Sequence, residues 1–265
     1  MEKRKRRSPD PDTASPDRGV RIRSLQPWLD RARSLHGWDF GDIHSRNLGP
    51  SLPWYFSACV LQRVAGRHSV LDMGTGGGEL LAILLPAFYG RVVATEEWSR
   101  NAPVAFRRLT PLGVSVVRSR SLHLPFADAT FDLVIDRHEE FDPPEVGRVL
   151  APGGEFITQQ VGHQEWRELR RFLPRMNDFG DLRLMYSRGF ERLGFEVEGT
   201  EHSYTVTYPS LGEIVFMLGV SPWTLPDFDL VRDLDALVAF EAQCSDAEGV
   251  VVTESRFLIT ARKPG

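Results

Sequence analysis

A run of glycines interrupts an apolar segment, Ser69 to Pro86, which reads SVLDMGTGGGELLAILLP. The apolar residues before the glycines are typical of a short buried strand, and those after them return at helical spacing. A strand that ends in glycines and leads into a helix presents backbone N–H groups at the helix N-terminus. A ligand can approach these groups closely because glycine has no Cβ atom. The segment therefore predicts a loop that cradles a nucleotide.

The positions of the glycines distinguish between classes of nucleotide. The dinucleotide fingerprint G-x-G-x-x-G, counted from Gly74, requires a glycine at position 79, where this chain has Glu79. The pattern G-x-G-x-G fits instead, through Gly74, Gly76 and Gly78. A carboxylate beside the loop disfavours a pyrophosphate and is compatible with a ligand that carries an ammonium and a sulfonium.

Four segments together resemble the class I S-adenosylmethionine-dependent methyltransferases, in particular the type 11 group, over roughly residues 54–160. In chain order they are VLDMGTGGG, the acid in VVATEEW, LPFADATFDLV and RVLAPGGEFI. The resemblance implies that the chain binds S-adenosylmethionine and transfers its methyl group. It also implies an α/β fold, a Rossmann-like, doubly wound, seven-stranded and mostly parallel sheet with an antiparallel C-terminal strand and an N-terminal helical extension.

The resemblance further implies which residues hold the cofactor. Asp72 and the glycine loop would hold its methionine end, and Glu96, at the tip of the second strand, would accept both ribose hydroxyls. The family usually has an acid before the LPF segment that contacts the adenine amino group. Here RSRSLHLPF has none, so Ser121 and the backbone of Leu122 are predicted in its place. The expected cofactor-binding residues are Asp72, Gly74, Thr75, Gly76, Gly78, Glu96, Glu97, Ser121, Leu122 and Arg137.

Methyl transfer is an in-line displacement at an activated carbon, so positioning supplies much of the acceleration and few side chains are obligatory. A base that helps a hydroxyl or protonated amine should lie at the carboxyl ends of the fourth and fifth strands. His138 is either a general base with a pKa near neutrality or a histidine hydrogen-bonded in its loop, and Glu139 is similar. Gln159 either orients an acceptor or ties loops together. Gln159 and Gln160 alternate along one strand, so only one is expected to face the cleft.

The segment DPPE, from Asp142 to Glu145, superficially resembles the motif of enzymes that methylate exocyclic amines of bases. That motif lies at a strand tip, whereas Asp142 follows Asp136 by six residues and the aromatic residue is replaced by Glu145. We interpret the segment as a helix start, with Asp142 as N-cap, Pro143 at the first helical position and Glu145 completing a capping box.

The elements that position these residues alternate as in a doubly wound sheet. Strands are predicted over residues 69–74, 91–96, 114–119, 131–137 and 153–161, and helices from Gly77, from about Asn101 and over 143–150. Residues 1–20 are expected to be a disordered basic, Pro-rich tail, 21–66 a helical lid region, and 67–265 the methyltransferase domain with an insert around 205–245. The aromatic residues Trp38, Trp54 and Trp223 either line an acceptor pocket or pack in the core.

Composition narrows the class of protein. The 265 residues, 42% apolar and 26% charged, suffice for one large domain. Cys59 and Cys244 are far apart, and no Cys or His has metal-ligand spacing, so no metal site and a reducing compartment are predicted. No window approaches eighteen consecutive apolar residues, so we expect a cytoplasmic protein without a membrane span.

The charge distribution bears on the acceptor. The net charge is −4 and the first seven residues carry +4, which leaves −8 for the remainder. A mildly acidic body offers no broad footprint for a phosphate backbone, so a small-molecule acceptor is expected. An RNA or protein methyltransferase, or a non-catalytic cofactor-binding or scaffold protein on the same fold, are the alternatives. An RNA acceptor stays an alternative because the chain has clustered arginines, namely Arg107, Arg108, Arg118, Arg120, Arg167, Arg170 and Arg171.

Overall fold

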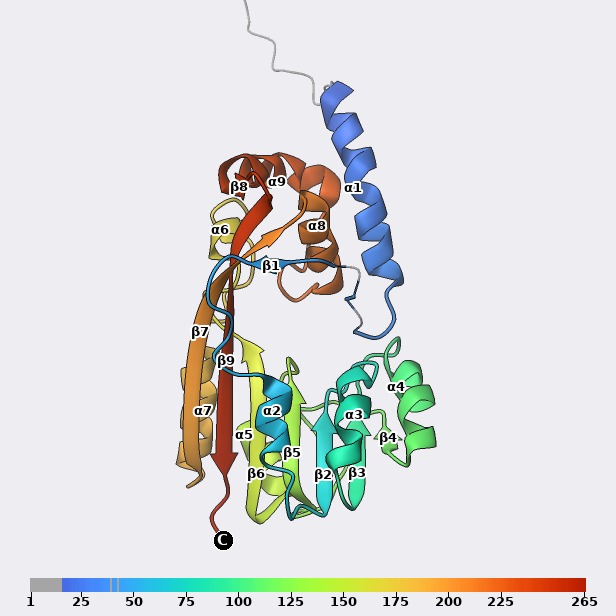
Figure 1. Ribbon diagram of the computed structural model, residues 1–265, viewed down its shortest axis with the longest axis vertical. Coiled ribbons are helices and arrows are strands. Elements are labelled where there is room, and N and C mark those ends of the chain that lie inside the picture. Colours follow the sequence, from blue (N-terminus) through green and yellow to red (C-terminus); the bar gives the residue numbers. More distant parts are fainter. Residues whose placement is uncertain (1–15, 39, 42) are drawn as a thin grey trace, which may run out of the picture.

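The computed structural model describes residues 16–38, 40–41 and 43–265, and a nine-stranded sheet lies at the centre of this part of the chain (Figure 1). The strands are β1 Arg46–Asn47, β2 Ser69–Met73, β3 Arg91–Thr95, β4 Ser115–Val117, β5 Phe131–Arg137, β6 Leu150–Val161, β7 Glu196–Tyr208, β8 Ser245–Asp246 and β9 Gly249–Arg262. Their order is β4-β3-β2-β5-β6-β9-β7-β1, with β8 paired to β9. Neighbours from β4 to β6 are parallel, whereas β9 is antiparallel to both β6 and β7. This is the predicted doubly wound sheet of seven strands, extended by the two-residue strands β1 and β8.

Helices connect the strands. They are α1 Pro16–Ser34, α2 Phe56–Leu61, α3 Glu79–Leu84, α4 Ala102–Leu109, α5 Pro143–Val149, α6 Arg167–Arg170, α7 Leu182–Arg192, α8 Leu211–Val220 and α9 Leu230–Cys244, with short 3₁₀ turns at Leu85–Ala87 and Thr110–Leu112. Because α1 begins at Pro16, the disordered tail expected to reach residue 20 is wrong for residues 16–20. Residues 1–15 lie outside the described residues.

The central strands are buried on both faces, because successive side chains of a strand point to opposite sides. Val70 of β2 packs in a cluster with Val60 of α2 and Leu81 of α3. Its neighbour Leu71 packs in a different cluster with Val149 of α5 and Phe190 of α7. The carboxyl edge of the parallel strands therefore lies between two helical layers, where open α/β sheets bind ligands.

A separate helical cluster lies where the long strand β7 ends and β9 begins (Figure 1). Leu29 of α1 packs with Ile214 and Leu218 of α8 and with Leu234 of α9. Ser210 begins α8 with a complete capping box. This cluster fixes the end of α1 and the loop after α8 above the carboxyl edge. In the described part of the chain, no helix is long and apolar enough to cross a membrane.

One predicted local structure is wrong. Asp142 is the N-cap of α5 and Pro143 its first residue, as expected, but the Asp142 side chain makes no capping hydrogen bond. Glu145 instead accepts a hydrogen bond from the backbone N–H of Leu124 (2.6 Å) and pairs with the guanidinium of Arg148 (2.8 Å). The capping box does not form because a charged partner one turn away and a second backbone donor hold the Glu145 carboxylate.

Candidate cofactor and acceptor site

The loop between β2 and α3 turns through three glycines in the left-handed region, Gly74, Gly76 and Gly78, with φ of 65°, 64° and 80°. A Cβ atom on Gly76 would stand 2.1 Å from Cδ1 of Trp38, and one on Gly74 would stand 2.5 Å from Cβ and Cγ of Glu139. Glycine is therefore required here both by the backbone conformation and by close neighbours.

Glu96 follows β3 and is buried, 4% exposed. One carboxylate oxygen accepts a hydrogen bond from the backbone N–H of Gly76 and the other from that of Trp98, each over 2.7 Å. Burial raises the pKa of Glu96, and these backbone bonds counteract the rise. A carboxylate offers about four acceptor positions, so both oxygens of Glu96 retain capacity for a ligand hydroxyl.

Asp72 lies at the end of β2 with its carboxylate buried beneath the loop. It accepts a hydrogen bond from the hydroxyl of Thr75 (2.5 Å). Burial raises the pKa of Asp72 to about 7, the Thr75 bond opposes this rise, and the negative charge of Glu96 adds to it. Asp72 and Thr75 are thus joined to the glycine loop by this hydrogen bond.

Two further carboxylates come from the end of β5. Burial, together with the charge of Glu96, raises the pKa of Glu139 to about 7, and the Ser121 hydroxyl donates to this carboxylate over 3.1 Å. Asp136 is fully buried, and burial together with the charge of Glu139 raises its pKa well above the usual range. Four acids, from β2, β3 and β5, are therefore held close enough to repel one another, and a cation bound among them relieves that repulsion.

The two glutamines of β6 point in opposite directions, as their alternation predicts. The Gln160 amide donates to the carboxylate of Asp136 (3.3 Å) and to the backbone carbonyl of Glu139 (2.8 Å). Gln159 lies on the other face, where its side-chain oxygen accepts from the indole N–H of Trp54 (2.9 Å). Gln160 therefore lies against the acidic residues Asp136 and Glu139, whereas Gln159 lies on the opposite face of the sheet beside Trp54.

His138 follows β5 in a left-handed conformation, φ 68°, which is strained for a residue with a Cβ atom. Its backbone N–H donates to the carbonyl of Gln159 (3.0 Å), and its ring forms no hydrogen bond within the described residues. The densely packed surroundings and the charges of Arg256 and Arg137 hold the pKa of His138 well below its usual range. The predicted pKa near neutrality is therefore wrong. His138 is exposed to solvent, and its imidazole is neutral near pH 7.

The remaining predicted residues lie at the same edge but differ in exposure. Ser121 is buried and bonded to Glu139, whereas Leu122 is 38% exposed. Glu97 is partly buried and pairs with Arg120 (3.3 Å). In the described residues no group of His, Cys, Asp and Glu is arranged to hold a metal ion.

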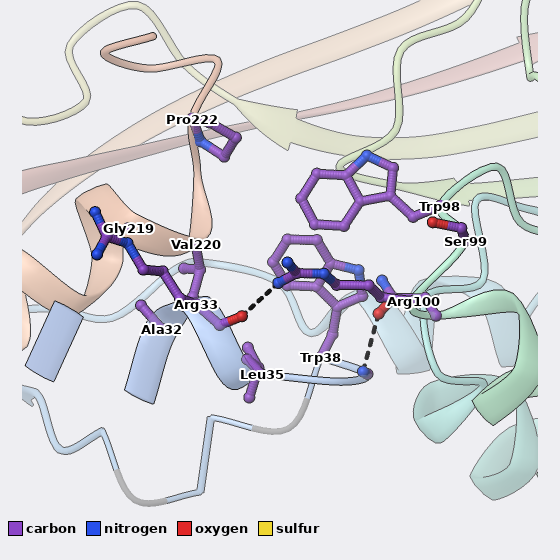
Figure 2. A pocket seen from close by; sticks show the side chains of 12 residues that line it. Ala32, Arg33, Leu35, Trp38, Trp98, Ser99, Arg100, Gly219, Val220 and Pro222 are labelled. Carbon is purple, nitrogen blue, oxygen red and sulfur yellow. Dashed lines mark hydrogen bonds between the residues drawn. The ribbon is translucent and has the colours of Figure 1, made fainter. Parts of the chain in front are cut away.

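Three tryptophans from distant segments meet above the loop, and the sequence had not singled out Trp98 among them. Its ring centroid lies 5.8 Å from that of Trp38 and 5.6 Å from that of Trp223. The sequence signal that could have identified Trp98 is its position two residues after Glu96. Trp38 and Trp98 also line a pocket of about 380 Å³ (Figure 2), together with the arginines Arg33 and Arg100.

A second pocket, of about 210 Å³, lies farther along the same edge of the sheet. Trp54 and Tyr204 contribute rings to its wall, and Glu254 contributes a carboxylate. Trp54 connects this pocket to Gln159, whose backbone carbonyl holds the N–H of His138. The candidate acceptor region therefore adjoins the end of β5.

The fold places the glycine loop at the carboxyl edge of a doubly wound sheet, and residues 70–154 match the family model described as a methyltransferase domain. A 23S rRNA (guanine(748)-N(1))-methyltransferase of Streptomyces fradiae is 29% identical over 190 residues, 68% of this chain and 66% of that protein. The match thus spans just under two thirds of the relative's length.

Solved structures share the fold at lower identity. The YcgJ protein from Bacillus subtilis superimposes with a TM-score of 0.60 at 16% identity, over 79% of this chain and 98% of its own. A putative methyltransferase from Bacillus halodurans C-125 does so with a TM-score of 0.56 at 20% identity, over 79% and 99%.

Proposed function

We propose that this protein binds S-adenosylmethionine in the glycine-loop cleft and transfers its methyl group to a small molecule. The observation that carries the proposal is the convergence of four carboxylates around a loop of left-handed glycines: Asp72, Glu96, Asp136 and Glu139. Such a cleft favours a cation and disfavours a pyrophosphate. S-adenosylmethionine carries an ammonium and a sulfonium.

The residues present fit this cofactor. Glu96 retains acceptor capacity on both oxygens for the ribose hydroxyls. Asp72, Glu139 and the loop backbone would hold the methionine end. When bound, the cofactor supplies a methyl group already activated by a positively charged sulfur.

The chain's own residues then orient the acceptor and take its proton. His138 follows the end of β5, and its neutral imidazole would accept the proton at a ring nitrogen. Gln159 and Trp54 order the adjoining wall through their hydrogen bond (2.9 Å). A second pocket of about 210 Å³ accommodates a small molecule beside these groups.

The free thiols of Cys59 and Cys244 suit the reducing cytoplasm.

The first test is calorimetric titration of the full chain with S-adenosylmethionine and with S-adenosylhomocysteine. Binding of both supports the proposed site, and the absence of binding of either overturns it. A second test incubates the protein with methyl-labelled cofactor and two fractions, cell metabolites and total RNA. Label in the metabolite fraction supports a small-molecule acceptor. Cofactor binding without label in either fraction supports the non-catalytic alternative.

RNA is the second candidate acceptor, because the Streptomyces fradiae relative is named as an rRNA methyltransferase. Most arginines that could contact RNA already have partners in this structure. Arg108 pairs with Glu79, and Arg170 pairs with Asp178. Label recovered in RNA would replace the small-molecule proposal by this one.

A further inference from the structure

Arg137, the last residue of β5, has no side-chain hydrogen bond or ion pair among the described residues, and it lies next to Gln159, which bonds a residue of the second pocket. We infer that Arg137 anchors an anionic group, a carboxylate or a phosphate, of the methyl acceptor. The inference rests on the proposed function and names the chemical class of its acceptor. It also assigns Arg137 to the acceptor instead of the cofactor.

Strand register places Arg137 on the same side of the sheet as the second pocket. Arg137 pairs with Gln159 of β6, which in turn pairs with Leu258 of β9. Paired residues of adjacent strands share a face, and so do alternate residues along one strand. Glu254 therefore shares the face of Leu258, and its strand partner Tyr204 shares it as well. Glu254 and Tyr204 both line the pocket.

The nearby positive charge of Arg256 is already compensated, whereas that of Arg137 is not. Arg256 is bonded to the carboxylates of Glu165 (2.6 Å) and Glu254 (3.1 Å). The guanidinium of Arg137 has no hydrogen bond or ion pair with any residue that the structure describes.

Glu254 is not free to turn toward Arg137. One of its oxygens accepts from the hydroxyl of Tyr208 (2.6 Å), and the other accepts from the hydroxyl of Tyr204 (2.6 Å) and from Arg256. An anion that enters from solvent can reach Arg137, whose side chain is exposed. Charge-assisted bonds to a guanidinium are strong and are frequently bidentate with carboxylate and phosphate.

The pocket walls specify the rest of the acceptor. Trp54 and Tyr204 line a volume of about 210 Å³, and Tyr55, which is 76% exposed, lines it as well. Such walls suit a planar, largely apolar body. The acceptor class is thus a small planar acid.

The test titrates the full chain with three probes of one shape: benzoate, phenyl phosphate and the neutral benzamide. Each titration is run with and without S-adenosylhomocysteine and followed by tryptophan fluorescence and calorimetry. We expect one or both anions to bind and benzamide to bind at least about tenfold more weakly. Whichever anion binds more tightly identifies the acid group. Equal affinity for benzamide, or no binding of either anion, overturns the inference.

Substitutions assign the effect to Arg137. Arg137→Gln should lower the affinity for the anionic probes about tenfold or more, and Arg137→Lys should retain part of it. Arg192→Gln, at an exposed arginine of α7, is the matched control and should change nothing. Unfolding curves verify that each variant is folded. If Arg137→Gln weakens S-adenosylhomocysteine and leaves the anions unaffected, Arg137 belongs to the cofactor site and the inference fails. Absence of S-adenosylhomocysteine binding by the wild type overturns the proposed function, whereas the anion titrations without it still decide this inference.

Discussion

The backbone N–H of Gly76 donates a hydrogen bond over 2.7 Å to the buried carboxylate of Glu96, and so joins the loop after β2 to the tip of β3. The same carboxylate holds the N–H of Trp98, whose ring packs on Trp38 above the loop. Loop, acid and aromatic cover are thus one connected unit. A change at either end of the Gly76–Glu96 bond is therefore expected to reach the whole cleft.

Glu96→Gln should reduce the affinity for S-adenosylhomocysteine by about 10- to 100-fold, because hydrogen bonds to a charged group contribute about 1.5–3 kcal/mol. Calorimetry measures the change. Glu198→Gln, at an exposed position of β7, is the control and should bind as the wild type does. Unchanged affinity in Glu96→Gln would show that the cleft has been placed wrongly.

Gly76→Ala should lower the free energy of unfolding by about 2–4 kcal/mol, because the strained φ costs about 1 kcal/mol and the contact with Trp38 adds an overpacking cost of about 1–3 kcal/mol. Gly113→Ala is the matched control. Gly113 also has a positive φ of 86°, but a Cβ atom there meets nothing within 4 Å. Urea unfolding compares the two variants. Equal losses would mean that the approach of Trp38 to Gly76 is not part of the folded state.

Protonation of Asp72 should make stability depend on pH. The pKa of Asp72 is raised by burial from its usual 3.8 to about 7, so between these values the folded protein binds a proton that the unfolded chain has lost. The free energy of unfolding therefore falls as pH rises from about 4 to about 7, by up to about 4 kcal/mol for this group. Urea unfolding of wild type and Asp72→Asn over this range isolates its share, because His138, whose lowered pKa acts in the opposite sense, is common to both. Parallel curves would contradict the prediction.

His138→Asn should separate chemistry from binding. Asparagine tolerates the left-handed backbone at this position, so the fold and the affinity for S-adenosylhomocysteine should be retained within about twofold. If the imidazole is the base, label transfer to the acceptor fraction should fall by about 10²- to 10⁴-fold. A wild-type rate of transfer in the variant would exclude His138 as the base.

Local patterns were sufficient to predict the strands and helices around the glycine loop. The apolar run before Gly74 and the helical spacing after it predicted β2 and α3, and the resemblance to a known family singled out Asp72 and Glu96. These features depend on neighbours along the chain. The capping box at Asp142 failed because its glutamate found stronger partners, Leu124 and Arg148, which the local pattern does not show.

The sequence by itself determined a doubly wound sheet, its glycine loop and the acids that follow its strands. Only the tertiary structure decided the pKa values of these groups, because it sets their burial and the charges near them. The pKa of Asp72 and that of Glu139 depend on burial and on carboxylates from other strands, and the low pKa of His138 depends on its packed surroundings and on Arg256, 118 residues later in the chain. Strand pairing likewise decides which charged groups lie near Arg137. Electrostatic interactions depend on distance and burial in space and not on separation along the chain.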